Sequence, residues 1–182
     1  MKYSINWLKD QISKGIPVDY FFFWGHTPKQ EGVVDKSCLS QWFPLPFKVD
    51  NITYATAEHW MMAGKAKLFK DEEALSKILG TPKPGSAKAI GREVRNFVKE
   101  VWDEHAGNIV VEGNYHKFSQ HESLKSFLIK TGNKIIVEAS PRDTIWGIGL
   151  SQNSEKATDP FQWRGTNWLG FALMEVRDRL KQ

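Results

Sequence analysis

The sequence predicts a single, helix-rich α+β domain with a small β-sheet. Three observations lead to this fold class. Most segments repeat their apolar residues with the period of a helix, and only a few alternate as strands do. The chain has 182 residues, enough for one domain with a buried core. No internal repeat, low-complexity tract or linker divides it, and its 41% hydrophobic and 25% charged residues are typical of a globular protein.

The N-terminal segment predicts a helix followed by a strand. Residues 1–15 carry apolar residues on one helical face, so we interpret residues 1–19 as a helical appendage to a domain of residues 20–182. The apolar run Tyr20–Trp24 predicts a buried strand that stops at Gly25.

The next segment predicts a loop, a hairpin and a capped helix. His26–Leu39 is polar and loop-like. Phe47–Tyr54 alternates apolar and polar residues around Asp50-Asn51, two residues that tolerate the backbone of a tight turn. Thr56 is a suitable N-cap for the helix that follows it.

The remainder of the chain predicts mainly helices. The β-branched run within Ile109–Glu112 leaves one of them ambiguous with a strand. Lys134–Glu138 is the clearest internal strand, Thr144–Leu150 is either a strand or a glycine-broken loop, and Ser151–Arg164 is a loop. The predicted helices are Glu72–Leu79, Ser86–Arg92, Val94–His105, Asn108–Phe118, Glu122–Lys130 and Asn167–Leu180.

Charge and cysteine content narrow the class of partner. The net charge of +4 favours an anionic ligand such as a phosphate, although the chain has no dense Lys/Arg tract and no known nucleic-acid recognition motif. One cysteine, Cys38, excludes an intramolecular disulfide and favours a reducing compartment. There is no apolar run of membrane-spanning length and no secretory signal, so we expect a cytoplasmic protein without a membrane partner or an obligate protein partner.

Motifs for metal, nucleotide and serine chemistry are absent. The five histidines lack the spacing of zinc ligands, and the sequence contains no phosphate-binding loop, dinucleotide fingerprint or nucleophile elbow. We therefore expect neither a metal nor a cofactor. Any chemistry must rest on carboxylates, lysines and aromatic rings.

The segment TAEHWMMAGKAKLF (Thr56–Phe69) places Glu58 and Lys65 seven residues apart, on nearly one face of a helix. A carboxylate suits general acid–base catalysis, and an amine in a partly apolar pocket can act as a nucleophile. Two structural explanations remain open. Glu58 in the first turn is favoured by the helix dipole, and a helical lysine is commonly solvated.

A second group of candidates follows the strand Lys134–Glu138. Glu138 ends the strand, Asp143 opens a turn, and Trp146-Gly147 places a flat ring beside backbone that a ligand can approach closely. The alternative is structural: a strand end, an Asx turn and a core tryptophan.

Phosphate contacts are predicted at two further places. Arg92, with Lys88 and Arg95, forms a basic face that suits a phosphate, as does Lys117 next to Asn114. A solvated helix face is the alternative for both groups. Asn167 is either a ligand contact or the cap of the last helix.

With these residues assembled, the chain resembles the NADAR family, the YbiA-like N-glycosidases, from Phe22 to Leu180. Asn51, His59 and His121 depart from the residues common in that family. The segments that carry the resemblance are Phe22–Gly25, Leu39–Phe69, Ile90–Phe97, Gly113–His121, Val137–Leu150 and Asn167–Arg177.

The resemblance implies hydrolysis of an N-glycosidic bond between a ribose phosphate moiety and an amino-substituted base. The implied substrate is either ADP-ribose attached to guanine in nucleic acid or a phosphoribosylamino-pyrimidine intermediate of riboflavin synthesis. The implied catalytic residues are Lys65, Glu58, Asp143 and Glu138. The implied substrate-binding residues are Arg92, Trp146, Gly147 and Asn167. We add Trp24, Gly25 and Lys117 as further candidate substrate-binding residues.

Two mechanisms are compatible with these residues. Lys65 forms a transient Schiff base with the opened sugar, or it only positions the ribose hydroxyls while water attacks C1. The competing class of function is a non-catalytic reader of ADP-ribose or a related nucleotide. In a third interpretation all of the paired charges are structural.

Overall fold

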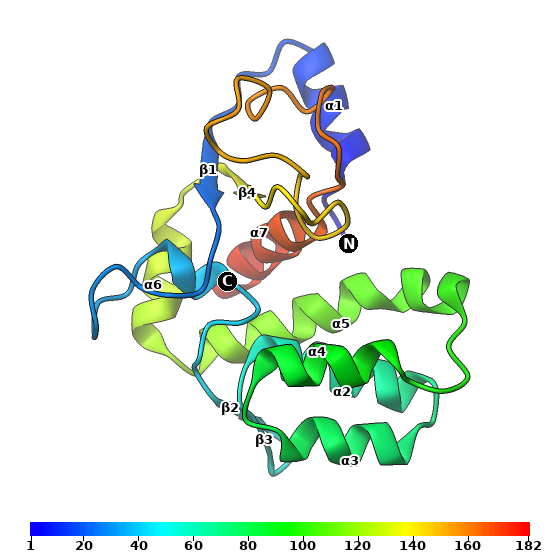
Figure 1. The fold of residues 1–182 in the computed structure, drawn as a ribbon. Helices are drawn as coiled ribbons and strands as arrows, with labels where there is room; N and C mark the ends of the chain where they lie inside the picture. The colour runs from blue at the N-terminus through cyan, green and yellow to red at the C-terminus, as the bar shows by residue number, and fades with distance from the viewer. The chain divides into compact units, whose positions relative to one another are not determined.

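The computed structural model describes residues 1–182, which form seven α-helices, one short 3-10 helix and four strands (Figure 1). The chain divides into two compact units. Residues 1–40 and 122–182 form the outer unit, and residues 41–121 form the inserted unit. The predicted α+β class is confirmed. None of the helices has both the length and the apolar composition that crossing a membrane requires.

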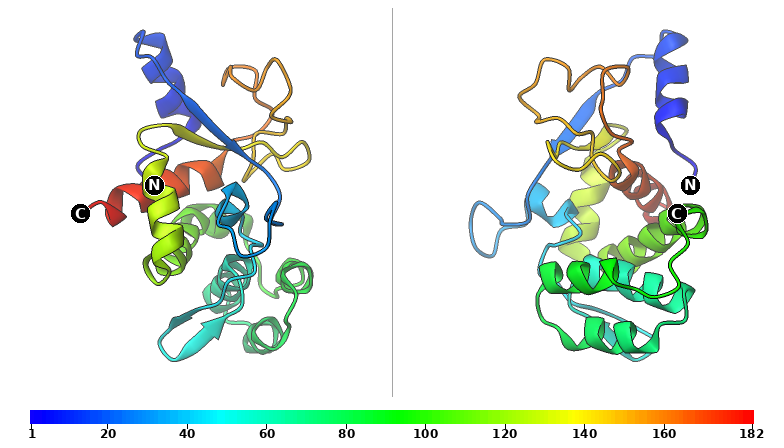
Figure 2. Two further views of the ribbon diagram at one scale, coloured as in Figure 1. Left: turned by 90° about the vertical axis from the view of Figure 1, so that its left-hand side faces the viewer. Right: turned by 45° about the vertical axis from the view of Figure 1, so that its right-hand side comes forward.

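The outer unit is built on two parallel strands, β1 (Tyr20–Phe23) and β4 (Ile135–Glu138). The apolar side chains of β4 are buried before Glu138, which fits a strand covered on both faces. Figures 1 and 2 show the two strands side by side, and the strand β4 packs against α7 (Trp168–Leu180). Helix α6 (Glu122–Lys130) also contacts α7.

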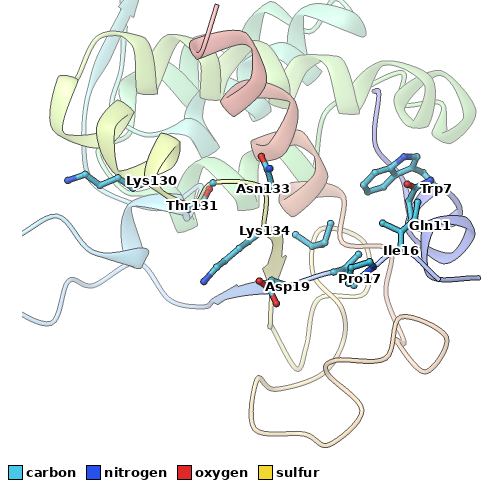
Figure 3. A pocket seen from close by; sticks show the side chains of 12 residues that line it. Trp7, Gln11, Ile16, Pro17, Asp19, Lys130, Thr131, Asn133 and Lys134 are labelled. Atoms are coloured by element: carbon cyan, nitrogen blue, oxygen red, sulfur yellow. The ribbon is translucent and has the colours of Figure 1, made fainter. Parts of the chain in front are cut away.

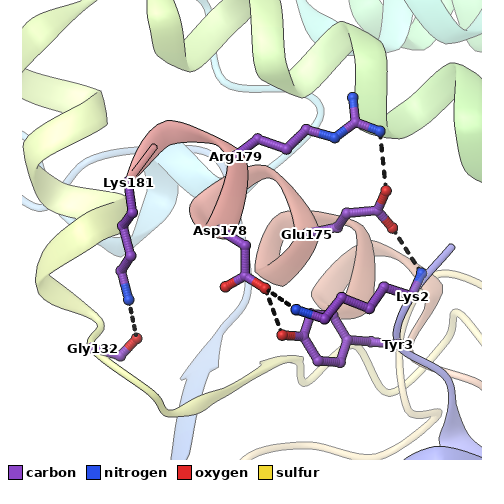
Figure 4. A network of polar contacts seen from close by, with 7 residues as sticks. All are labelled: Lys2, Tyr3, Gly132, Glu175, Asp178, Arg179 and Lys181. Atoms are coloured by element: carbon purple, nitrogen blue, oxygen red, sulfur yellow. Dashed lines mark hydrogen bonds and ion pairs between the residues drawn. The ribbon is translucent and has the colours of Figure 1, made fainter.

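The predicted N-terminal helix is confirmed as α1 (Ile5–Ser13), capped by the Ser4 side chain. Polar contacts join the residues before it to α7 (Figure 4). The Lys2 ammonium and the Tyr3 hydroxyl both donate to the Asp178 carboxylate, at 2.7 and 2.6 Å. The N-terminal segment is therefore tethered to the last helix of the outer unit.

The inserted unit begins with the predicted hairpin of β2 (Phe47–Val49) and β3 (Ile52–Tyr54). Asp50 and Asn51 both have positive φ, at 48° and 63°, as a two-residue type I′ turn requires. Thr56 then caps α2 (Ala57–Leu68) as predicted.

Helix α2 is the centre of the inserted unit. It packs against α3 (Glu72–Gly80), α4 (Pro84–Arg92) and α5 (Lys99–Ser119). A Cβ at Gly113 of α5 would lie only 2.3 Å from the Trp60 ring, so this glycine permits the close contact of α2 and α5.

Several predicted boundaries were wrong. The two helices expected at Val94–His105 and Asn108–Phe118 are the single helix α5, and residues 94–98 are not helical. Asn96 has a positive φ of 57°, which interrupts a helix there. Helix α4 starts two residues earlier than predicted, with Pro84 at its first position.

The ambiguous segments are now assigned. Ile109–Glu112 is helical within α5. Residues 144–150 form the glycine-broken loop rather than a strand, and a 3-10 helix, η1 (Lys36–Leu39), ends the loop predicted at His26–Leu39.

Candidate active site

The candidate residues lie in both units of the fold, so we describe them as two groups. The group in the inserted unit consists of Glu58, Lys65, Arg92 and Lys117. The group in the outer unit consists of Trp24, Gly25, Glu138, Asp143, Trp146, Gly147 and Asn167.

Glu58 is a buried carboxylate at the start of α2, only 2% exposed. Its backbone N–H donates to the Gln41 carbonyl at 2.9 Å, and the Gln41 side chain accepts a hydrogen bond from the Asn114 amide of α5 at 2.8 Å. Gln41 and Asn114 are also buried. Burying a carboxylate is costly without compensating partners, so the helix dipole alone does not explain this position. We did not predict from the sequence that Gln41 contacts both Glu58 and Asn114.

Lys117 is another buried charge of the inserted unit, with no exposed surface. It lies one turn after Asn114 on α5, and its ammonium lies 5.6 Å from the centre of the Phe43 ring. The solvated alternative is therefore wrong for Lys117. Its contact with substrate stays a prediction.

Lys65 is half-buried, and protein groups hold its ammonium. Nζ donates to the Gly91 carbonyl of α4 at 2.8 Å and lies 4.0 Å from the centre of the Phe97 ring. Burial lowers the Lys65 pKa from its usual value, because the charged form loses water. The alternative of a fully solvated helical lysine is therefore wrong.

Glu58 and Lys65 belong to one stripe of α2, with Met62 between them. Met62 packs on Gly91, where a Cβ would lie 2.0 Å from the sulfur atom. Met62 and Lys65 of this stripe face α4, where both contact Gly91. Seven residues of helix separate Glu58 from Lys65 by about 10 Å along the axis. That the two side chains act on one sugar stays a prediction.

The predicted basic face needs one correction. The Arg95 guanidinium pairs with the Asp71 carboxylate at 2.7 Å, and this pairing holds the Asp71 pKa well below its usual range. Arg95 is thus committed to a partner within the protein. Arg92 and Lys88 remain as the cations of α4, and Arg92 is exposed in its last turn.

In the outer unit, the parallel pairing brings Glu138 and Trp24 together at the C-terminal end of the two strands. Glu138 lies opposite Phe23, and Trp24 follows Phe23 directly. The Trp24 indole is 58% exposed, and Gly25 has a φ of 86° that favours glycine. An exposed indole at a strand end is suited to stacking on a flat ligand.

Asp143 organises the loop after β4. Its Oδ1 accepts hydrogen bonds from the backbone N–H groups of Ile145 and Trp146, at 2.9 and 2.7 Å, and from that of Gly147 at 3.4 Å. The Asx turn left open by the sequence is therefore present. A role for the Asp143 carboxylate in catalysis stays a prediction beside this structural one.

Substitutions of Asp143 separate the two roles. Asp143→Asn keeps an Oδ1 acceptor, so its free energy of unfolding should lie within about 0.5 kcal/mol of the wild-type value. Asp143→Ala removes the acceptor and should lower the free energy of unfolding by about 1–3 kcal/mol. Urea denaturation measures both values. If the Asn variant is stable but does not hydrolyse substrate, the charge of the Asp143 carboxylate has a chemical role. If the variant is stable and fully active, Asp143 serves only to form the turn.

Trp146 and Gly147 are held close to other parts of the outer unit. The half-buried Trp146 ring packs edge-to-face on Trp168, with 5.6 Å between the ring centres. A Cβ at Gly147 would lie 2.8 Å from the Glu138 carbonyl oxygen, so glycine is required by the approach to β4. Of the two candidate indoles, Trp24 and Trp146, Trp24 is the more exposed.

Asn167 does not cap the last helix with its side chain. Its Oδ1 instead accepts a hydrogen bond from the Glu138 N–H at 3.0 Å, and its Nδ2 donates to the Ile136 carbonyl at 2.9 Å. The amide thus pairs with the edge of β4 as a neighbouring strand would. Asn167 does occupy the N-cap position of α7, as the capping alternative expected, but without a side-chain capping hydrogen bond. Substrate binding by Asn167 stays a prediction.

A cavity lies at the N-terminal end of strands β1 and β4. Its volume is about 570 Å³, and it is lined by α1, the residues before β1 and the turn between α6 and β4 (Figure 3). Its charged residues, Asp19, Lys130 and Lys134, are exposed, and Figure 3 shows Lys130 extending away from Trp7. None of the candidate site residues lines it.

The comparisons with known proteins agree on one family. The NADAR domain family matches residues 22–181. An N-glycosidase of Acanthamoeba polyphaga mimivirus is 45% identical over 168 residues, which cover 90% of this chain and 97% of the relative. The N-glycosidase YbiA of Escherichia coli is 30% identical over 146 residues, which cover 80% of this chain and 82% of the relative.

The solved structures agree with this result. The NMR structure of Escherichia coli YbiA superposes with a TM-score of 0.68 at 25% sequence identity, covering 91% of this chain and 88% of that chain. The match over residues 22–181 and the identities to these relatives establish that the chain belongs to the NADAR family.

Proposed function

We propose that this protein is an N-glycosidase that hydrolyses the bond between C1 of a ribose and the amino group of a base, and that its substrate is ADP-ribose on guanine in nucleic acid. The names of two curated relatives, at 45% and 30% identity, support the reaction class. The observation that carries the proposal is Lys65. Its amine is half-buried, has a lowered pKa and shares a helix stripe with the buried carboxylate of Glu58.

The reaction begins when the sugar ring opens. The bond between C1 and the ring oxygen breaks, the ring oxygen takes a proton, and C1 forms an iminium with the base nitrogen. The neutral Lys65 amine adds to C1, and the base amine leaves with a proton from a carboxylic acid. Water, activated by the resulting carboxylate, then releases the sugar and restores the amine. We assign the acid–base role to Glu58 because it is the buried carboxylate of the Lys65 stripe.

Groups on the protein surface serve the rest of the substrate in this proposal. Arg92 and Lys88 of α4 supply positive charge for the phosphates. These assignments follow from exposure and charge.

The pH dependence tests the covalent step. Borohydride added during turnover should leave a stable adduct on Lys65, detected by mass spectrometry of peptides. Because burial lowers the Lys65 pKa and only the neutral amine attacks, adduct formation should rise with pH and level off below the pH at which an ordinary lysine titrates, about 10.4.

Lys67, on the same helix but exposed, is the internal control and should stay unmodified. An adduct that is absent at every pH would contradict the Schiff base and leave direct attack by water.

A chromatographic assay tests the substrate. An oligonucleotide with one ADP-ribosylated guanine should yield free ADP-ribose and unmodified guanine, faster than a phosphoribosylamino-pyrimidine yields free base. Faster release from the pyrimidine would move the assignment to the riboflavin intermediates. Tight calorimetric binding of ADP-ribose without hydrolysis of either compound would instead establish a non-catalytic reader.

A further inference from the structure

The Lys65 amine lies against an aromatic ring that is not part of any helix. Phe97 belongs to the segment between α4 and α5, and its ring centre is 4.0 Å from Lys65 Nζ. The Trp102 ring lies farther away, at 5.6 Å, and the Gly91 carbonyl accepts a hydrogen bond from Nζ at 2.8 Å. Phe97 nevertheless remains 42% exposed, which is unusual for a ring whose only role is to fill a core.

The backbone before Phe97 is fixed in the position that places its ring there. The buried Asp71 carboxylate accepts hydrogen bonds from the Arg95 N–H at 2.8 Å and from the Arg95 guanidinium at 2.7 Å. Asn96 then adopts a left-handed conformation with φ of 57°, which turns the chain sharply. The Phe69 ring of the α2 C-cap packs edge-to-face on Phe97, with 5.3 Å between the ring centres.

These contacts restrict the position of the Lys65 amine, which would be free to move if only the helix backbone held the side chain. The face of the Phe97 ring attracts an ammonium and excludes water from one side of it. The Gly91 carbonyl fixes a second direction. The rotamer freedom of a lysine side chain held in this way is already restricted in the protein without substrate. Less conformational entropy is therefore lost when the amine meets a substrate.

We propose that Phe97 is a positioning residue for Lys65, holding its amine at the place from which it meets the sugar. This inference rests on the proposed function of Lys65. Phe97 itself acts through Lys65 and has no chemical role. The Asp71–Arg95 pair and the left-handed Asn96 hold the ring in place.

The test compares three variants with the wild-type protein. Phe97→Leu removes the ring, Phe97→Tyr keeps it, and Phe161→Leu is the matched control. Phe161 is 55% exposed and also has a lysine over its ring, Lys9, with Nζ at 5.5 Å. Thermal unfolding verifies that each variant is folded. If the leucine variant does not fold, Phe97→Met, which keeps an apolar side chain without the ring, replaces it.

Two measurements are made on each variant. The first is kcat and KM for the N-glycosidase reaction. The second is the rate at which a small amine-reactive anhydride labels Lys65 in the protein without substrate, relative to Lys67 in the same sample.

The Phe97→Leu variant should lose at least about tenfold in kcat with little change in KM, and its Lys65 should be labelled at least about threefold faster because the ring no longer covers the amine. Phe97→Tyr and Phe161→Leu should match the wild type in both measurements.

Each other outcome overturns the proposal in an identifiable way. Faster labelling with unchanged kcat would show that Phe97 covers Lys65 without serving the reaction. A lower kcat with unchanged labelling would show that Phe97 acts on something other than the amine. A wild-type protein that hydrolyses no glycosylamine would refute the proposed function and with it the role of Phe97, while the labelling rates would still report whether the ring covers Lys65.

Discussion

Replacing Lys65 by alanine is expected to lower kcat/KM for N-glycoside hydrolysis by at least about 100-fold, the usual effect of removing one acid–base or positioning group. Both mechanisms proposed for Lys65 require its amine. The loss should therefore appear whether Lys65 forms a Schiff base or only orients the ribose. A chromatographic assay of base release under saturating and limiting substrate gives kcat and KM separately.

Two other substitutions make the Lys65 result specific. Lys67→Ala removes an exposed lysine from the same helix and should leave turnover within about twofold, as expected for a surface change. Lys65→Arg keeps a positive charge but has no amine for a Schiff base. An active arginine variant would favour direct attack by water. If the alanine variant keeps more than a tenth of the wild-type rate, Lys65 is not the group that carries the reaction.

Replacing Asn167 by alanine is expected to lower the free energy of unfolding by about 2–4 kcal/mol. The change removes two hydrogen bonds and leaves the Glu138 N–H and the Ile136 carbonyl without their side-chain partner, at about 1–3 kcal/mol for each unsatisfied buried group. Asn167 is fully buried, so water cannot readily replace its amide. Urea denaturation monitored by tryptophan fluorescence provides the measurement.

A glycine variant separates the side chain from the backbone. Asn167 has a φ of 55°, which alanine tolerates poorly and glycine tolerates well. Asn167→Gly should therefore be destabilised as well, since the two hydrogen bonds are lost, but by less than the alanine variant. Asn153→Ala, at an exposed loop position, should change stability by no more than about 0.5 kcal/mol. Wild-type stability in the glycine variant would show that the amide contacts to β4 contribute nothing.

Hydrophobic period and turn residues predicted most of the elements. The hairpin followed from Asp50-Asn51, the start of α2 from Thr56, and the strand β4 from its apolar run. In each case the physical cause lies within a few residues of the chain. For the hairpin it is a backbone conformation that only certain residues adopt, for α2 a cap that satisfies helix N–H groups, and for β4 a run of apolar side chains. The family was recognisable for a related reason, since its segments are local patterns in a fixed order.

Two of the corrected predictions depended on partners far along the chain. Arg95 belonged to a basic face until the structure paired it with Asp71, 24 residues earlier. Asn167 suited a helix cap, but its amide reaches β4, 29 residues earlier at Glu138. The helix predicted through residues 94–98 is interrupted by the left-handed Asn96, and the hydrophobic period contains no sign of that conformation.

The candidate site shows the same division between what local sequence patterns predict and what tertiary packing decides. The residue types and their spacing were sufficient to select Glu58 and Lys65, because a helix places residues seven apart on one stripe. Only the packing of helices on one another decided that Glu58 and Lys117 are buried and that the Lys65 amine is held between the Gly91 carbonyl and the Phe97 ring. Burial and contact across elements depend on which surfaces meet, and this is a property of the whole chain that no local pattern encodes.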